Sequence, residues 1–327
     1  MPGQQRGSTA QAVTARPVGP SVGAGEVALD DQPMERVNQP TKFWRGFWPT
    51  AREVWDYREL LGQLIKKELK VKYKDSVLGF FWTLLRPLLY LLVYAVAIGI
   101  FLGSGRVIPQ FGIYLFTGLL AWTLFTDILG GCTGSIVGNA GLVKKVYFPR
   151  ELFPLAVVGA GLVNFLLQAV ILVGAYLVTW TWPAPENLPL VPMALVALVL
   201  FATGLGLILA AGNVFLRDIT YLVEVGLLLW FWMTPIVYDW TKVRTTLVED
   251  NSIGVLFQVY MANPMANVVL AFQRALWPGG LTEQGQPFYY DGNLYLRLTV
   301  IIVVGLGFVW LAQRIFARSQ GNFAQEL

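Results

Sequence analysis

The side chains with the clearest chemistry in this chain are cations and aromatic rings on either side of Val77. Before it stands a basic run, and after it an arginine and three aromatic residues recur every four positions. The run contains Lys66, Lys67, Lys70, Lys72, Tyr73 and Lys74, and the stripe contains Trp82, Arg86, Tyr90 and Tyr94. Aromatic faces stack on sugar rings, and an arginine guanidinium binds phosphate through two parallel hydrogen bonds. The stripe therefore predicts a binding pathway.

Each part of the stripe has an alternative interpretation that the sequence leaves open. Trp82 follows two phenylalanines where an aromatic belt belongs at a membrane surface. Tyr90 and Tyr94 lie deeper and suit either a pathway or helix packing. Arg86 can extend to the surface or bind the phosphate of a lipid at the mouth of the pathway.

The sequence contains few of the residues that enzymes use to break covalent bonds. The chain has no histidine and one cysteine, Cys132, which removes the usual general base and any cysteine metal cluster. No Gly-x-x-x-x-Gly-Lys-Ser/Thr loop is present to bind nucleotide. Glu249 and Asp250 are interpreted as solvated loop charges. We therefore expect no catalytic site, metal or cofactor in this chain, and no nucleic-acid partner, because the net charge is only +4.

Hydrophobic residues make up 55% of the chain and charged residues 13%, which is typical of a membrane protein. Residues 57–74 form an amphipathic helix when placed at about 100° per residue. Leu64 and Ile65 share its apolar side, which suits the acyl boundary, and the lysines face the headgroups. Glu68 and Lys72 interrupt the apolar side, but at i,i+4 they can pair with each other.

The rest of the pattern predicts an all-α polytopic membrane protein with six transmembrane helices. Crossing a bilayer takes about 20 apolar residues. The expected spans are 77–102, 111–137, 152–182, 190–214, 221–238 and 294–316. Residues 253–277 are interrupted by Asn263-Pro264, which favours an outer re-entrant helical pair over a seventh span. The lysine and arginine distribution places both termini in the cytoplasm.

Four regions follow from this pattern. Residues 1–40 read as a disordered cytoplasmic tail, 41–76 as the amphipathic interfacial segment, 77–318 as the six-span domain and 319–327 as a cytoplasmic C-terminal tail. Within the spans, Asp127 and Glu224 are interpreted as structural partners of other helices, and Asn164 and Gln168 as interhelical hydrogen-bonding residues.

The inner loop 138–151 mixes positive charges with apolar side chains, including Leu142, Val143 and Phe148. Such a loop is either a docking surface or a helix packed back on its own bundle. Composition alone does not choose between these interpretations.

Several of these segments together resemble the type-2 ABC exporter permeases that move polysaccharides, such as the O-antigen, galactan and teichoic-acid exporters. The element Lys72-Tyr73-Lys74-Asp75-Ser76-Val77-Leu78-Gly79, followed by Trp82 and Pro87-Leu88, is similar to the start of that family. So are the loop ending Lys145 to Glu151, the turn Asn213 to Asp218, the run Thr234-Pro235-Ile236 and the segment around Asn263-Pro264. The likeness covers residues 57–318 in order.

The resemblance implies a homodimer in a bacterial cytoplasmic membrane, with two copies of a separate ABC ATPase that binds ATP and magnesium. It assigns ATPase coupling to Lys144, Lys145, Val146, Tyr147, Phe148, Pro149, Arg150, Arg217 and Asp218. It also places the interfacial lysines and Tyr73 at the cytoplasmic mouth of the pathway. For Arg217 and Asp218, charges at helix ends explain the residues equally well.

The leading hypothesis is an ATP-driven exporter subunit for a lipid-linked polysaccharide. The first alternative is a drug or antibiotic exporter of the same class. A membrane-embedded enzyme that processes glycans is a second alternative, but no set of catalytic acids supports it.

Overall fold

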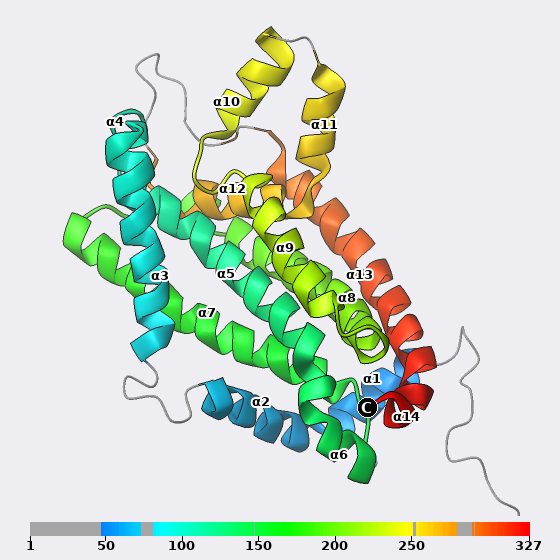
Figure 1. The fold of residues 1–327 in the computed structure, drawn as a ribbon. Helices are drawn as coiled ribbons and strands as arrows, with labels where there is room; N and C mark the ends of the chain where they lie inside the picture. The colour runs from blue at the N-terminus through cyan, green and yellow to red at the C-terminus, as the bar shows by residue number, and fades with distance from the viewer. Residues whose placement is uncertain (1–46, 73–80, 147, 251–252, 280–289, 291) are drawn as a thin grey trace, which may run out of the picture. The chain divides into compact units, whose positions relative to one another are not determined.

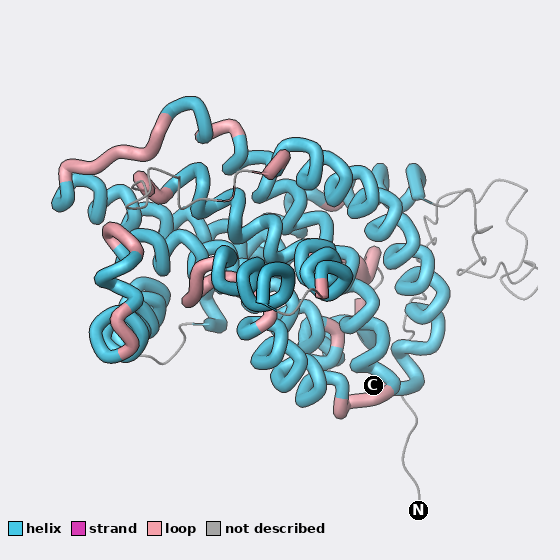
Figure 2. The backbone as a smooth tube through the Cα atoms, turned by 90° about the horizontal axis from the view of Figure 1, so that it is seen from above, coloured by secondary structure: helices cyan, strands magenta, loops and turns pink. Residues whose placement is uncertain are grey.

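Helices are the only regular elements in the described residues, which are 47–72, 81–146, 148–250, 253–279, 290 and 292–327 of a computed structural model. Figure 2 shows the helices and the loops that join them. All of these residues belong to one unit, Pro40–Leu327. The predicted all-α polytopic class is confirmed. The proposed tail 1–40 and the residues Tyr73, Lys74 and Tyr147 lie outside the described residues.

The first half of the unit carries α1 to α7. Its elements are α1 Phe47–Asp56, α2 Arg58–Lys72, α3 Phe81–Tyr94, the π-helix η2 Ala95–Phe101, α4 Ser104–Val107, α5 Phe111–Ser135, the 3-10 helix η3 Val137–Asn139, α6 Ala140–Lys145 and α7 Leu152–Thr179. The second half continues with η4 Pro185–Asn187, α8 Leu190–Phe215, α9 Ile219–Trp232, α10 Trp240–Arg244, η5 Thr245–Asp250, α11 Gly254–Ala262, α12 Pro264–Leu276, α13 Leu294–Ser319, η6 Gln320–Asn322 and α14 Phe323–Glu326.

Five helical segments are long and apolar enough to cross a membrane. They are Leu84–Phe101, Phe111–Ser135, Leu152–Thr179, Pro185–Phe215 and Leu294–Glu326. The fifth span expected from the sequence is shorter than predicted, because α9 ends at Trp232. Its 14 residues extend about 21 Å at about 1.5 Å per residue. Pro235 cannot continue a helix, since it lacks a backbone donor and clashes with the preceding turn.

The segment around Asn263-Pro264 folds as a bent pair. The helices α11 and α12 meet at an angle of 78°. The Asn263 side chain caps α12 by accepting a hydrogen bond from the Met265 amide at 3.0 Å, and it also accepts one from Trp230 Nε1 at 3.0 Å. Figure 1 shows both helices at the end of the bundle opposite α2 and α6. This placement favours the re-entrant arrangement, and the two ends are called the α11 end and the α2 end below.

Small residues set the packing at the centre of the bundle. The helix α5 is buried along most of its length and contacts α7, α8 and α12. On α8, Gly204 faces the ring of Phe308 and Gly206 faces the side chain of Cys132. Lipid tails are as apolar as leucine, so helices in a membrane associate through close packing at such residues. A Cβ at Gly206 would lie 2.9 Å from Cys132 Cβ.

The amphipathic helix α2 packs on protein and not only on lipid. Leu64 on its apolar side is buried, and α2 contacts α7. Gly159 of α7 makes this approach possible, because a Cβ there would lie 2.5 Å from Ile65 Cδ1 and 2.8 Å from Ile65 Cγ1. The apolar side that the sequence assigns to the acyl boundary therefore contacts the transmembrane bundle.

Replacing Gly159 by leucine is expected to push α2 away from α7. Overpacking of this kind costs about 1–3 kcal/mol. Trypsin should then cleave more rapidly after the lysines of α2, and mass spectrometry of the fragments measures this. The matched control is Gly174→Leu on the same helix, where a Cβ meets no atom within 4 Å. Equal cleavage rates in the two variants would contradict the packing role of Gly159.

Candidate functional site

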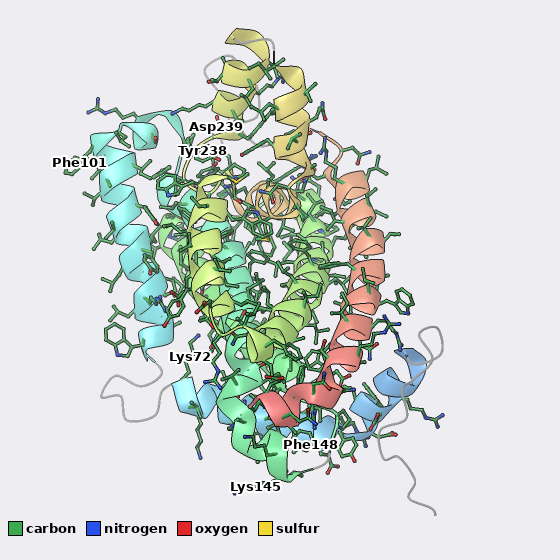
Figure 3. The ribbon with its side chains drawn as sticks, turned by 45° about the vertical axis from the view of Figure 1, so that its right-hand side comes forward. Lys72, Phe101, Lys145, Phe148, Tyr238 and Asp239 are labelled. Carbon is green, nitrogen blue, oxygen red and sulfur yellow. The ribbon has the colours of Figure 1, made fainter. Side chains whose placement is uncertain are left out.

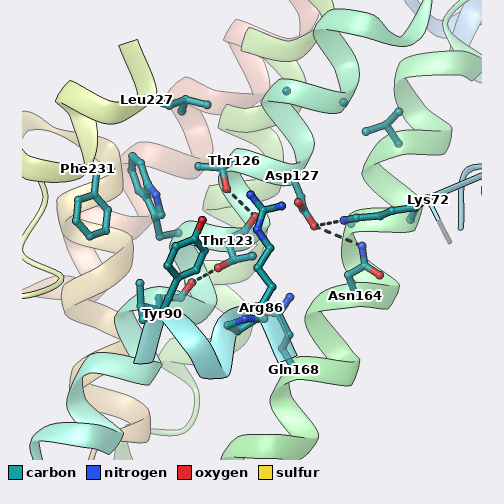
Figure 4. A pocket seen from close by; sticks show the side chains of 18 of the residues that line it. Lys72, Arg86, Tyr90, Thr123, Thr126, Asp127, Asn164, Gln168, Leu227 and Phe231 are labelled. Carbon is teal, nitrogen blue, oxygen red and sulfur yellow. Dashed lines mark hydrogen bonds and ion pairs between the residues drawn. The ribbon is translucent and has the colours of Figure 1, made fainter. Parts of the chain in front are cut away.

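A cavity of about 1060 Å³ opens between the last turns of α2 and the helices α3, α5, α7 and α9 (Figure 4). The four residues of the predicted stripe, Trp82, Arg86, Tyr90 and Tyr94, all line it. Their spacing of four residues keeps them on one side of α3 as far as Tyr94, where the backbone changes to the π-helix η2. The structure thus brings the predicted pathway residues together in one cavity.

Aromatic rings form a continuous series along this cavity. The Arg86 guanidinium lies over the ring of Tyr90, 5.9 Å from its centroid. Tyr90 stacks with Tyr94 at 6.4 Å between centroids, and Tyr94 stacks with Phe231 of α9 at 5.7 Å. Tyr90 is 46% exposed, whereas Tyr94 is partly buried against α9. Tyr90 therefore presents its ring to the cavity, and Tyr94 both lines the cavity and packs α3 against α9.

A charged network joins α2 to two transmembrane helices inside the cavity. Lys72 Nζ donates a hydrogen bond to Asp127 Oδ2 of α5 at 3.0 Å, and Asn164 Nδ2 of α7 donates to the same oxygen at 3.3 Å. Figure 4 shows both side chains directed at this carboxylate. The roles expected for Asp127 as a structural partner and Asn164 as an interhelical donor agree with this geometry.

The i,i+4 pairing of Glu68 with Lys72 that the sequence suggests is wrong. In the described residues Lys72 pairs with Asp127, and the Glu68 carboxylate lies 4.0 Å from Lys67 Nζ. Lys72 reaches Asp127 because the last turn of α2 borders the cavity that Asp127 lines.

Sequence reasoning missed the polar side of α5 as a wall of the cavity. Thr123, Thr126 and Asp127 line it together with Gly130 and Gly131. Their spacing of three and four residues is the helical period, so a search for polar and small residues on one face of a span would have found them. Gln168 of α7 and Glu224 of α9 also line the cavity.

A second candidate site lies at the α2 end, where the loop 138–151 is partly exposed and partly packed. Lys144 and Lys145 are exposed, as is Val146 at 51%. The rings of Phe148 and Phe153 pack together with 5.3 Å between their centroids, and Pro149 is buried. The loop is therefore packed at Phe148 and Pro149 and exposed from Lys144 to Val146, and its docking role stays a prediction. Figure 3 shows Lys145 and Phe148 at this end, away from Tyr238 and Asp239 at the other.

The C-terminal residues hold this loop in place. Arg150 donates a hydrogen bond to the carbonyl of Gln320, and its guanidinium lies 5.9 Å from the centroid of the Phe323 ring. Phe323 is fully buried in an apolar cluster with Phe153, Phe316 and others. The tail expected at 319–327 thus folds as η6 and α14 against the bundle. Beside it, burial raises the pKa of the Glu151 carboxyl, and the charge of Arg150 partly opposes that shift.

The remaining predicted residues also gather at the α2 end. Arg217 and Asp218 are exposed in the turn between α8 and α9. Asn213 fixes this turn by donating to the Thr133 carbonyl at 2.9 Å and accepting from the Thr220 hydroxyl at 3.0 Å. On α2, Lys66 and Lys70 are exposed, while Lys67 donates a hydrogen bond to the side chain of Asn139. The interfacial helix is thereby linked to the loop that begins at η3.

No group of three or more His, Cys, Asp or Glu side chains that could hold a metal ion occurs in the described ranges. The family follows from comparison with known proteins. Residues 59–248 match the model of the family described as ABC-2 type transporter, and this range covers more than half of the chain. The chain belongs to the ABC-2 type transporter family. The matched range of this ABC-2 chain contains α2 from its second residue onward, the residues that line the cavity, and the loop 138–151.

Three relatives are similar over most of their own length. The ABC-2 chain is 31% identical over 277 residues to the O-antigen export system permease protein RfbA of Myxococcus xanthus, covering 85% of this chain and 98% of that protein. It is 29% identical over 270 residues to RfbA of Klebsiella pneumoniae, with coverage of 82% and 95%. It is 24% identical over 229 residues to the polysialic acid transport protein KpsM of Escherichia coli, with coverage of 67% and 82%.

Proposed function

We propose that this ABC-2 chain is the membrane subunit of an ATP-driven exporter that moves a lipid-linked polysaccharide from the cytoplasmic to the outer side of the membrane. The observation that carries the proposal is the cavity near the α2 end, which combines stacked aromatic rings with Arg86 and Lys72. The relatives named for O-antigen export and polysialic acid transport support the substrate class.

The cavity suits a polymer that slides. An exposed aromatic ring stacks on a sugar without selecting one sugar, and a tyrosine adds a hydroxyl for hydrogen bonding. The amide side chains of Asn164 and Gln168 line the same space and supply further hydrogen-bonding groups. An anionic lipid carrier is accommodated at Arg86, because guanidinium binds phosphate through paired hydrogen bonds.

The energy for transport comes, in this proposal, from a separate ABC ATPase that holds ATP and magnesium. Its docking surface is the α2 end, where Leu142, Lys144, Lys145 and Val146 are exposed. Lys66, Lys70 and Arg217 are exposed at the same end, which by the positive-inside rule faces the cytoplasm. Both termini then lie on the cytoplasmic side of a bacterial cytoplasmic membrane.

A homodimer is the proposed assembly. Only 11% of the residues in the apolar segment Leu84–Phe101, which runs through α3 and η2, are buried within one chain, although this segment also borders the cavity. Exposed apolar side chains continue on α9, including Leu228, Leu229 and Trp232. A second copy placed against α3 and α9 would close the open side of the cavity and convert it into a pathway between two chains.

Depleting the chain from its native cell tests the proposed function. Lipid-linked glycans should accumulate on the cytoplasmic face of the membrane and disappear from the cell surface. The accumulated material would also identify the polymer and its lipid carrier. Unchanged glycan pools and surface polymers would contradict polysaccharide export, and a drug exporter of the same class would become the leading account.

A further inference from the structure

Lys72 and Arg86 differ in how their charges are satisfied within one cavity. Lys72 is held by the carboxylate of Asp127, with an ion-pair distance of 3.0 Å. The Arg86 guanidinium lies over the face of the Tyr90 ring, and within the described part of the chain no carboxylate lies within 4.0 Å of it. Figure 4 shows both side chains extending into the same pocket.

The ion pair of Lys72 is readily exchanged. The lysine side chain remains 42% exposed and the aspartate side chain 25% exposed. Ion pairs open to water contribute little to stability, because water screens the charges and holding both side chains costs entropy. A group with more than one negative charge and several acceptor oxygens competes well for such a lysine, because the attraction between two groups grows with the product of their charges.

The other acidic residues of the cavity do not replace Asp127. Glu68 lies nearest to Lys67, at 4.0 Å, and Glu224 is exposed on α9. Asp127 also receives the hydrogen bond from Asn164, so its carboxylate keeps a donor when Lys72 leaves. Its charge is then still compensated in part, which lowers the cost of separating the pair.

We propose that Lys72 and Arg86 together bind a phosphate or diphosphate group, and that Asp127 holds Lys72 in an ion pair until that group binds. This inference rests on the proposed function, in which a lipid carrier supplies the phosphate at the α2 end. Asp127 acts as an internal substitute for the ligand. Among the described residues that line the cavity, it leaves Arg86 as the cation without an acidic partner, and it releases Lys72 as a second cation when the phosphate is present. Lys72 also ends α2, so the exchange releases the last turn of this helix from α5.

Binding measurements with the full-length chain in phosphatidylcholine nanodiscs test this inference. The probes are farnesyl diphosphate as a lipid-borne diphosphate and inorganic pyrophosphate as the free anion, both titrated by calorimetry. Lys72→Gln and Arg86→Gln should each weaken binding about tenfold, as expected for loss of a charge-assisted hydrogen bond. Asp127→Asn should strengthen binding about threefold to fivefold, because it frees Lys72 from a competing charge.

The double variant Lys72→Gln/Asp127→Asn provides the decisive comparison. The increase in binding affinity caused by Asp127→Asn should fall below about twofold when Lys72 is replaced by glutamine, because both substitutions act through the Lys72 ammonium group. Lys72→Arg should retain binding because it keeps the positive charge. If Asp127→Asn does not fold, the comparison of Lys72→Arg with Lys72→Gln still tests whether the charge at this position binds the ligand. Arg58→Gln at the other end of α2 and Asp56→Asn are the matched charge controls.

A purely structural role for the ion pair predicts the opposite pattern. Both Lys72→Gln and Asp127→Asn would then lower the melting temperature, and neither would strengthen binding, which would overturn the inference. Tighter binding of farnesyl diphosphate than of pyrophosphate identifies a lipid-borne ligand, and equal binding identifies a free phosphate. These titrations require no transport. Failed binding with intact export rejects only this inference, and intact binding without export rejects only the proposed function.

Discussion

Replacing Arg86 by alanine is expected to reduce the rate of glycan export by about tenfold to a hundredfold while leaving the chain folded. A hydrogen bond to a charged group contributes about 1.5–3 kcal/mol, and about 1.4 kcal/mol corresponds to a factor of ten. Arg86 is exposed in the cavity and its contact is the Tyr90 ring. Its removal therefore takes away ligand contacts with little loss of internal packing.

The rate is measured in vesicles that contain the chain and its ATPase, with dimer formation checked by gel filtration. Arg86→Lys should recover part of the rate, because it keeps the charge but loses the paired hydrogen bonds. Arg106→Gln is the matched control, because Arg106 lies in α4 outside the cavity lining. Equal transport rates for Arg86→Ala and the parent protein would contradict the role given to the cavity.

Replacing Phe323 by alanine is expected to destabilise the chain by about 3–5 kcal/mol, the usual cost of a large aromatic side chain lost from a packed core. Phe323 is fully buried, and the centroid of its ring lies 5.4 Å from that of Phe316 and 6.1 Å from that of Phe215. It also lies under the guanidinium of Arg150. Its loss should therefore loosen the loop 138–151 as well as the C-terminal helix.

The measurement combines thermal unfolding in detergent with ATP hydrolysis by the assembled transporter. We expect a lower melting temperature and hydrolysis that no longer responds to substrate. Gln325→Ala is the matched control on the same short helix, because Gln325 is exposed. A melting temperature equal to that of the control would show that the C-terminal residues do not hold the loop.

The long apolar helices and the bend between α11 and α12 are predictable from the sequence because their signals are local. Apolar runs of membrane-spanning length give the long helices, and Asn263-Pro264 marks the break between α11 and α12. The four-residue spacing of Trp82, Arg86, Tyr90 and Tyr94 likewise places them on one side of α3. The end of α9 is less predictable, because apolar residues continue past Trp232 and only Pro235 signals the stop.

The partners of charged residues are not predictable in the same way. Lys72 has Glu68 four residues away on its own helix, yet it pairs with Asp127, which is 55 positions along the chain. The choice depends on how α2 lies against α5 and α7, and Gly159 controls part of that approach. The burial of Phe323 is not predictable either. The residues around it form a short polar segment, from which the sequence predicts a tail, and only the tertiary packing buries the ring.

Reconstituted transport tests the central claim most directly. The chain and its ATPase are placed in vesicles with the α2 end outward, and a labelled lipid-linked glycan is added to the outer leaflet. The account predicts that ATP, but not a non-hydrolysable analogue, makes the glycan resistant to periodate applied from outside. ATP hydrolysis with the glycan still fully sensitive to periodate would contradict export through this chain.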